Sequence, residues 1–190
     1  MINLEIEENY INGKLNGKIK KKILGNLLME NEYLNGKLNG KQKLYYGGKI
    51  ILENECINGI LIKQKEYNKD GLLKFEGECL YNKKRKGKNY IKGKLEYEGE
   101  YLFDRKYNGK GYDENGNIIY ELINGNGRVK EYDREDRLIF DGEYLNGRRW
   151  NGIFKRYNYF NGTISEEEVY KYGKKFNWNK LIKYQFWLIK

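Results

Sequence analysis

A short phrase recurs along this chain at nearly constant spacing. Its clearest copies are Phe75-Glu76-Gly77-Glu78-Cys79-Leu80, Tyr97-Glu98-Gly99-Glu100-Tyr101-Leu102 and Phe140-Asp141-Gly142-Glu143-Tyr144-Leu145. We take the fifth residue of the phrase as its anchor, which gives Tyr10, Tyr33, Cys56, Cys79, Tyr101, Leu122, Tyr144 and Tyr170. Successive anchors lie 23, 23, 23, 22, 21, 22 and 26 residues apart. Spacing this regular indicates an array of repeats, each packed on its neighbours.

Each copy of the phrase has the alternation of a half-buried β-strand. Phe75, Gly77 and Cys79 are predicted to point to one side, and the residues between them to the other. Turn dipeptides with low-cost positive φ follow several anchors, at Asn12-Gly13, Asn35-Gly36, Asn58-Gly59 and Asn146-Gly147. A second set lies about midway between anchors, at Gly47-Gly48, Asp70-Gly71, Lys92-Gly93, Asn115-Gly116 and Asn161-Gly162. One repeat is therefore predicted to be one β-hairpin.

Hairpins in series predict an all-β fold. We expect an elongated, single-layer antiparallel meander of about seven to eight hairpin repeats. The array is predicted at residues 4–164, and a degenerate last repeat with an aromatic C-terminal cap at residues 165–190. The aromatic residues of that segment include Phe176, Trp178, Tyr184, Phe186 and Trp187. An interfacial membrane anchor is the alternative for this tail, because Trp187 lies among lysines, but its period is closer to two than to 3.6.

The glycine two residues before the anchor is unusual inside a strand, because it gives up side-chain packing. We expect it to make room for an aromatic ring from another repeat on the backbone. In other copies its place is taken by Asn31, Asn54 and Tyr120. The residues predicted to define the repeat structure are Tyr33, Phe75, Gly77, Tyr97, Gly99, Tyr101, Phe140, Gly142 and Tyr144.

The chain is basic, with 37 Lys and Arg against 27 Asp and Glu and a formal net charge of +10. Several basic clusters adjoin turns, so we expect them to line one edge of the sheet. The candidate residues for an anionic partner are Lys20, Lys21, Lys22, Lys83, Lys84, Arg85, Lys86, Arg148 and Arg149. Such a row fits anionic phospholipid or the phosphates of nucleic acid. The alternatives are solvated turn residues that maintain solubility, and a codon bias that enriches Lys, Asn, Ile and Tyr together.

No pattern of catalytic or ligand-binding residues is found. The chain has no His, the commonest near-neutral acid or base. Carboxylate pairs such as Glu76 and Glu78 recur with the repeat, which indicates a solvated strand face paired with Lys or Arg on adjacent strands. Gly109-Lys110-Gly111 lacks the spacing and the following helix of a phosphate loop. We therefore predict a protein that is not an enzyme and has no cofactor or metal site.

The two cysteines, Cys56 and Cys79, are anchors of adjacent repeats. Equivalent positions two strands apart are separated by roughly 9–10 Å. An unstrained disulfide needs its Cα atoms within about 7 Å. We interpret the cysteines as small buried substitutes for Tyr.

The combination of aromatic-x-Gly-Glu-aromatic, Asn-Gly and Gly-Lys-Gly resembles the MORN repeat (membrane occupation and recognition nexus). It is also similar to the MORN-variant repeat of bacterial toxin-antitoxin proteins. The best stretches run from Tyr97 to Gly116 and from Phe140 to Gly162, and the resemblance covers about residues 4–164. The resemblance implies a single-layer sheet that serves as a scaffold or docking surface, sometimes at anionic lipid headgroups. It carries over no catalytic residues.

We expect a non-enzymatic scaffold or docking module for an unidentified protein partner, with a secondary association with anionic membrane. One alternative is an antitoxin or immunity protein that neutralises a toxin by binding, and another is nucleic-acid binding. Open end strands make an end-to-end or edge homodimer a further expectation. The N-terminal residues do not resemble a signal peptide, and no apolar run approaches about 20 residues. A cytoplasmic protein, peripheral at a membrane if it binds lipid, is therefore expected.

Overall fold

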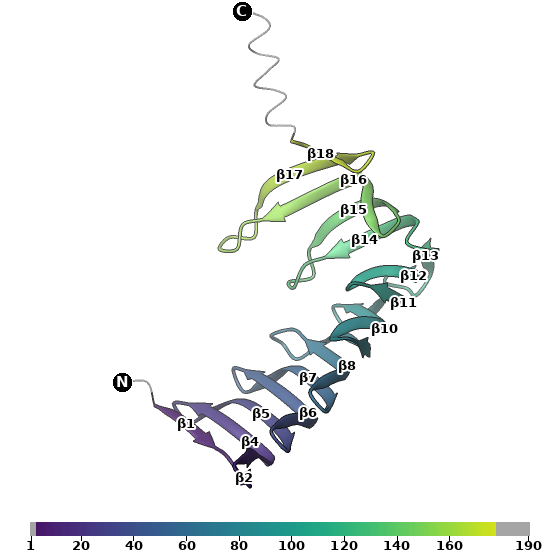
Figure 1. The fold of residues 1–190 in the computed structure, drawn as a ribbon. Coiled ribbons are helices and arrows are strands. Elements are labelled where there is room, and N and C mark those ends of the chain that lie inside the picture. The colour runs from purple at the N-terminus through teal and green to yellow at the C-terminus, as the bar shows by residue number, and fades with distance from the viewer. Residues whose placement is uncertain (1–2, 178–190) are drawn as a thin grey trace, which may run out of the picture. The chain divides into compact units, whose positions relative to one another are not determined.

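The computed structural model describes residues 3–177, and every regular element in that range is a β-strand. The strands form open antiparallel meanders of sequential hairpins (Figure 1). This confirms the predicted fold class and is consistent with a repeat protein. The chain divides into two compact units, Met1–Arg105 and Lys106–Lys190. The division predicted between residues 164 and 165 stays a prediction, and Trp178, Tyr184, Phe186 and Trp187 of the predicted cap lie outside the described residues.

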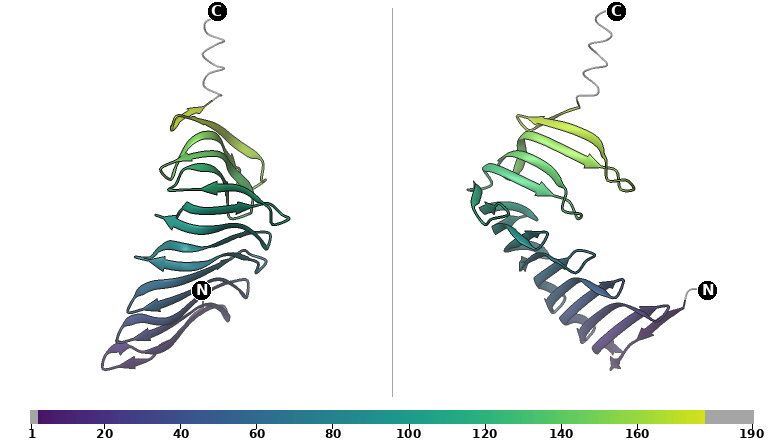
Figure 2. Two further views of the ribbon diagram at one scale, coloured as in Figure 1. Left: turned by 90° about the vertical axis from the view of Figure 1, so that its right-hand side faces the viewer. Right: turned by 180° about the vertical axis from the view of Figure 1, so that it is seen from behind.

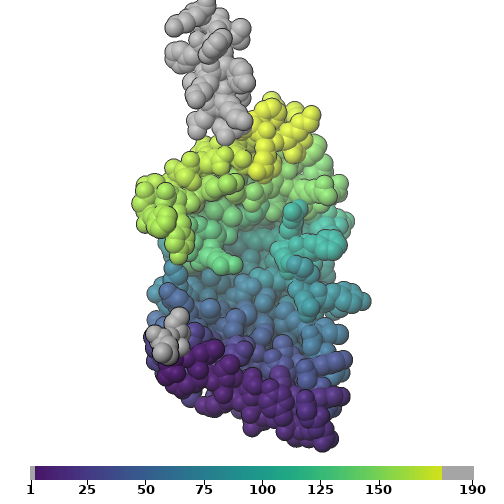
Figure 3. All heavy atoms as spheres, turned by 60° about the vertical axis from the view of Figure 1, so that its left-hand side comes forward, coloured from purple at the N-terminus to yellow at the C-terminus, as the bar shows by residue number. Residues whose placement is uncertain are grey.

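The first unit is a row of strands in which each long strand pairs with its neighbours in sequence (Figure 2). Its strands are β1 (Leu4–Glu7), β2 (Tyr10–Ile11), β3 (Lys14–Leu15), β4 (Gly17–Ile23), β5 (Asn26–Leu34), β6 (Lys37–Tyr46), β7 (Lys49–Ile57), β8 (Ile60–Tyr67), β9 (Leu73–Leu80), β10 (Lys83–Ile91) and β11 (Lys94–Leu102). The order is β1-β4-β5 and then consecutively to β11, while β2 and β3 pair with each other. In the space-filling view the heavy atoms of this unit follow one another in sequence order, from purple to teal (Figure 3).

The second unit repeats this hairpin arrangement. Its strands are β12 (Arg105–Tyr112), β13 (Ile118–Leu122), β14 (Gly127–Tyr132), β15 (Leu138–Leu145), β16 (Arg148–Tyr157), β17 (Ile164–Lys171) and β18 (Lys174–Asn177). β12 pairs with β13, and β14 to β18 pair in sequence order. A bridge between Ile123 and Asn126 closes the turn that joins the two groups.

The turns after the anchors share one backbone conformation. Asn12, Asn35, Asn58 and Asn146 have φ between 50° and 52°, and the glycine that follows each of them also has positive φ. Two positive-φ residues define the tight hairpin turn whose twist matches that of the flanking strands. These predicted turns are confirmed.

Neighbouring strands of the first unit carry opposite charges. Glu76 on β9 lies opposite Lys65 on β8 and Lys88 on β10, and its carboxylate is 3.4 Å from Lys65 Nζ. The same arrangement recurs one repeat earlier at Glu53, between Lys43 and Lys65. Each exposed pair contributes at most about 1 kcal/mol. Together they favour the observed register, as the recurring carboxylate pairs predict.

Aromatic rings lie on strand glycines and form much of the core. Phe75 is almost fully buried, and a Cβ added at Gly77 would lie 2.8 Å from its Cζ and against the carbonyl oxygen of Lys86. Gly87, opposite Gly77 on β10, meets the same ring. The predicted space-making role of the glycine is confirmed, but the prediction that the ring comes from another repeat is wrong. Residues i and i+2 share a face of a strand, so Phe75 covers the glycine of its own strand.

This packing predicts a cost for any side chain at the strand glycine. Gly77→Ala is expected to lower the free energy of unfolding by about 1–3 kcal/mol, because the new methyl group meets backbone on one side and the ring on the other. Denaturant unfolding followed by circular dichroism measures the change. Glu78→Ala, at the next, exposed position, is the control and should change stability by less than about 0.5 kcal/mol. Equal losses for the two variants would contradict this account of the glycine.

Cys56 and Cys79 are both buried, and both are free thiols. Burial raises the pKa of Cys56, and it raises the pKa of Cys79 to about 11. Because the thiolate is the reactive form, both thiols should react slowly with a disulfide reagent near neutral pH. We expect fast labelling of both only in denaturant, measured by the absorbance of the released thiol. Leu80→Cys, at an exposed neighbour, provides a fast-reacting control, and equally fast native labelling of Cys79 would contradict its burial.

Candidate functional site

The predicted basic residues of β4 and β10 lie within strands, and most are paired with carboxylates. Lys22 Nζ is 2.8 Å from Glu7, and Lys83 Nζ is 2.7 Å from Asp104. The remaining pairs in these clusters are Lys20 with Glu30, Lys84 with Glu66 and Arg85 with Glu78. Lys84 Nζ also lies 3.9 Å from the centre of the Phe75 ring. The structure brings Lys83, Lys84, Arg85 and Lys86 together at the start of β10, and Lys20, Lys21 and Lys22 together on β4.

Arg148 and Arg149 begin β16 in the second unit, and only Arg148 is exposed. The Arg149 guanidinium bonds to both carboxylate oxygens of Glu131 and lies 4.3 Å from the Phe154 ring centre. Burial lowers the pKa of Arg149, but the hydrogen bond and charge of Glu131 outweigh it and raise the pKa above its ordinary value. Arg149 thus acts as a packing and pairing residue inside this unit. An edge of cations that serves an anionic partner stays a prediction.

A row of exposed apolar side chains runs along one edge of the first unit, a surface that the sequence reasoning missed. We call this the anchor edge, because its turns follow the anchors. The row consists of Ile11, Leu34, Ile57, Leu80 and Leu102, which are between 44% and 62% exposed. Each follows its anchor directly, and the anchors Cys56, Cys79 and Tyr101 are buried. Strand alternation therefore places the row on the opposite face. An apolar residue after every one of these anchors was the signal in the sequence.

Lysines accompany the apolar row on the same face. Lys14 lies opposite Ile11, and Lys37 lies opposite Leu34 in their hairpins. Directly opposed residues of an antiparallel pair share a face. Both lysines are exposed, and neither side chain forms an ion pair or hydrogen bond with the residues that the structure describes. The anchor edge therefore presents apolar and positively charged groups side by side.

Hydrogen bonds tie the turns of the anchor edge to the neighbouring hairpins. The N–H of Gly36 donates to the carbonyl oxygen of Leu15 at 2.9 Å, and that of Gly59 donates to Leu38 at 2.7 Å. In the next turn the second residue is Asn82, whose Oδ1 accepts the N–H of Leu61 at 3.0 Å. These cross-links hold the row of turns as one continuous edge.

Two turns of the anchor edge carry an aromatic residue where the other turns have Asn. Tyr81 and Phe103 both have φ of 51° and are 82% and 77% exposed. A bulky side chain at positive φ is strained, whereas Asn reaches this conformation at lower cost. Because both rings are exposed, burial of their apolar surface does not compensate for the backbone strain. Such an outlier motivates the hypothesis that these rings contact a partner.

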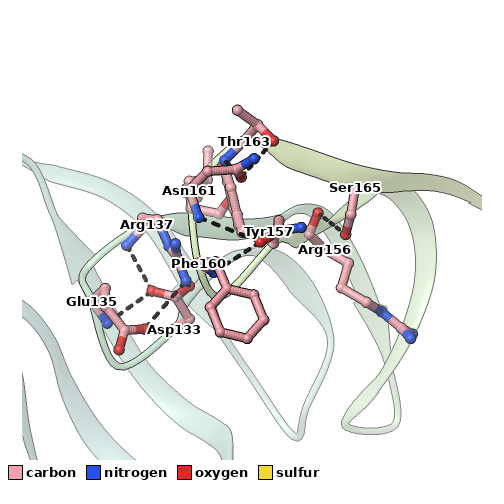
Figure 4. Close-up of polar contacts among 11 residues, drawn as sticks. Asp133, Glu135, Arg137, Arg156, Tyr157, Phe160, Asn161, Thr163 and Ser165 are labelled. Atoms are coloured by element: carbon pink, nitrogen blue, oxygen red, sulfur yellow. Dashed lines mark hydrogen bonds and ion pairs between the residues drawn. The ribbon is translucent and has the colours of Figure 1, made fainter.

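The second unit has an exposed aromatic tip of a different kind. Asn158 organises the turn after β16, where its Oδ1 accepts the N–H of Phe160 at 2.8 Å. The Phe160 side chain is 94% exposed. Its ring extends from the turn (Figure 4). In the preceding hairpin the Asp133 carboxylate accepts the N–H groups of Glu135 and Arg137. These hydrogen bonds shape the two turns, and the exposed Phe160 ring packs edge-on against Tyr159 with ring centres 5.7 Å apart.

No family model matches this chain, and no curated protein matches it. Among the described residues, no three His, Cys, Asp or Glu side chains are grouped to hold a metal ion. In the same part of the chain, no helix has the length and apolar character needed to cross a membrane.

Because Tyr81 and Phe103 are strained, we expect their replacement by Asn to increase the stability of the protein. Tyr81→Asn and Phe103→Asn should each raise the free energy of unfolding by up to about 1 kcal/mol, because Asn adopts positive φ with less strain. Asn58→Tyr, at the equivalent turn position, is the matched reverse swap and should lower stability by a similar amount. Thermal unfolding by calorimetry measures all three. Destabilisation by Tyr81→Asn would show that the ring has an internal role.

Proposed function

We propose that this chain is a non-enzymatic repeat scaffold of the MORN type, which docks a protein partner on the anchor edge of its first unit. Two observations support the family assignment: the anchor spacing, and the ring-on-glycine hairpins of the open meander. The assignment to MORN itself rests on the residue pattern around Gly99 and Gly142.

One observation carries the proposed docking function: Tyr81 and Phe103 are strained and exposed beside a row of exposed apolar residues. Contiguous exposed apolar surface marks interaction sites in soluble proteins. Aromatic side chains also dominate the binding energy of many protein interfaces. The hydrogen bonds between the turns would lower the cost of ordering this edge on binding.

The charges of the anchor edge favour an acidic partner surface. Lys14 and Lys37 are exposed cations on the same face as the apolar row. A partner with apolar recesses bordered by Asp or Glu would match both components, and complementary charge would speed its association. Neutralisation of a toxin would be the same binding mode with a toxin as the partner.

A binding comparison tests the proposal. The full chain and the Tyr81→Asn/Phe103→Asn double variant are used as baits in a cell extract, and captured proteins are quantified by mass spectrometry. We expect an acidic protein whose recovery falls at least about tenfold with the double variant, equivalent to about 1.4 kcal/mol. Tyr46→Ser removes an exposed aromatic residue beside the Gly47-Gly48 turn and should leave recovery unchanged.

Two further arms of the same experiment separate the other partner classes. Flotation with anionic phospholipid vesicles and retention on single-stranded RNA are measured for the same variants. Equal protein recovery by chain and double variant would overturn docking on the anchor edge. A third outcome is that no protein is captured and that the double variant loses binding to vesicles or to RNA. The ligand of the anchor edge would then be that lipid or RNA and not a protein.

A further inference from the structure

β1 is an edge strand with one neighbour among the described residues. It pairs with β4 through Leu4 with Ile23, Glu5 with Lys22, Ile6 with Lys21 and Glu7 with Lys20. Leu4 and Ile6 are 53% and 45% exposed. A strand with one side unpaired presents backbone groups that another chain can bond.

The backbone groups that face outward can be assigned from the pairing. The N–H of Leu24 donates to the carbonyl oxygen of Asn3 at 2.9 Å, so Asn3 and Leu24 form a hydrogen-bonded pair. Such pairs alternate with non-bonded pairs along an antiparallel ladder. The backbone groups of Glu5 and Glu7 therefore point toward β4, and those of Leu4 and Ile6 point away from it.

The charge pattern of the first unit defines what fits beside β1. An acidic strand lies between two basic strands in the interior of this unit. Glu30 lies opposite Lys20 and Lys43, and Glu53 lies opposite Lys43 and Lys65. β1 is also acidic, but Lys20 and Lys22 of β4 supply cations on one side only.

We propose that the outer edge of β1 binds an extended basic segment of a partner protein, which adds as an antiparallel strand. Its Lys or Arg residues at alternate positions lie opposite Glu5 and Glu7, and its backbone bonds Leu4 and Ile6. This surface and this partner chemistry differ from those of the anchor edge, where apolar and basic groups are exposed.

A second copy of β1 fits this edge poorly. When two β1 strands pair antiparallel with Leu4 opposite Ile6, or with Ile6 opposite Ile6, Glu5 lies opposite Glu5 or Glu7 of the other copy. Like charges directly opposite each other destabilise a strand pair. A basic strand avoids this repulsion. It also places cations on the second side of β1, so that β1 has basic neighbours on both sides, as the interior acidic strands do.

The test uses a probe whose antiparallel pairing with the inner side of β1 is seen in the structure. A fluorescent peptide with the sequence of residues 17–23, the strand that pairs with β1 from the other side, is titrated with the full chain. Anisotropy should report binding that weakens as salt is raised, because the contacts include exposed ion pairs. The same peptide with Lys20→Glu and Lys22→Glu is the control and should bind at least tenfold more weakly.

Variants of the chain locate the binding. Ile6→Pro removes an outward N–H and leaves the β4 side bonded, as Pro on an edge strand permits. We expect it to weaken peptide binding at least tenfold, with an unchanged circular dichroism spectrum. Glu5→Gln/Glu7→Gln keeps the backbone and should remove most of the salt dependence. Glu55→Gln, on the interior strand β7, should change neither.

Two results would overturn the proposal. One is equal peptide affinity for the chain and for both β1 variants. The other is self-association of the chain, seen by analytical ultracentrifugation and abolished by Ile6→Pro, which would make a second copy the occupant. Neither result bears on the anchor edge, because Tyr81 and Phe103 are unchanged in every variant.

Discussion

The two-residue turn with positive φ at both positions is the constraint on which the other features depend. At Asn35-Gly36 and Asn58-Gly59 it reverses the chain with two residues and sets the two strand pairs next to the turn, before the register shifts further along both hairpins. The register then puts the anchor inside and the next residue outside. Because the turn recurs with the repeat, one local conformation produces both the buried ladder and the exposed apolar row of the anchor edge.

Strand glycine and aromatic ring form one packing unit. Phe75 precedes Gly77 and Phe140 precedes Gly142, and in both hairpins the ring would contact a Cβ at the glycine. Where the residue two positions earlier is aliphatic, the glycine is replaced by a side chain, as at Asn54 after Leu52. A smaller aliphatic residue leaves the space that a ring would occupy. Tyr81 and Phe103 differ from these core rings, because they add backbone strain and are exposed to solvent.

The hairpins, their turns and the space-making role of Gly77 could be predicted, because each depends on residues close together in the sequence. Pairing of strand carboxylates with cations on adjacent strands was predicted, but the carboxylate partners of the basic clusters were not. Arg149 looked like a turn cation, yet it bonds to Glu131, which lies 18 residues away on another hairpin. The apolar row was also missed, because a single exposed Leu carries no signal and only its recurrence along one edge does. Whether any cation serves an anionic partner stays a prediction.

The sequence by itself determined the repeat, the hairpin and the alternation of buried and exposed positions. Those properties follow from spacing and from the conformational preferences of Gly and Asn. Only the tertiary structure decided which charges are neutralised, that Tyr81 and Phe103 are left in water, and that acidic β1 pairs on one side only among residues 3–177. These depend on which strands become neighbours, and hydrogen bonds and side-chain packing between hairpins establish that arrangement.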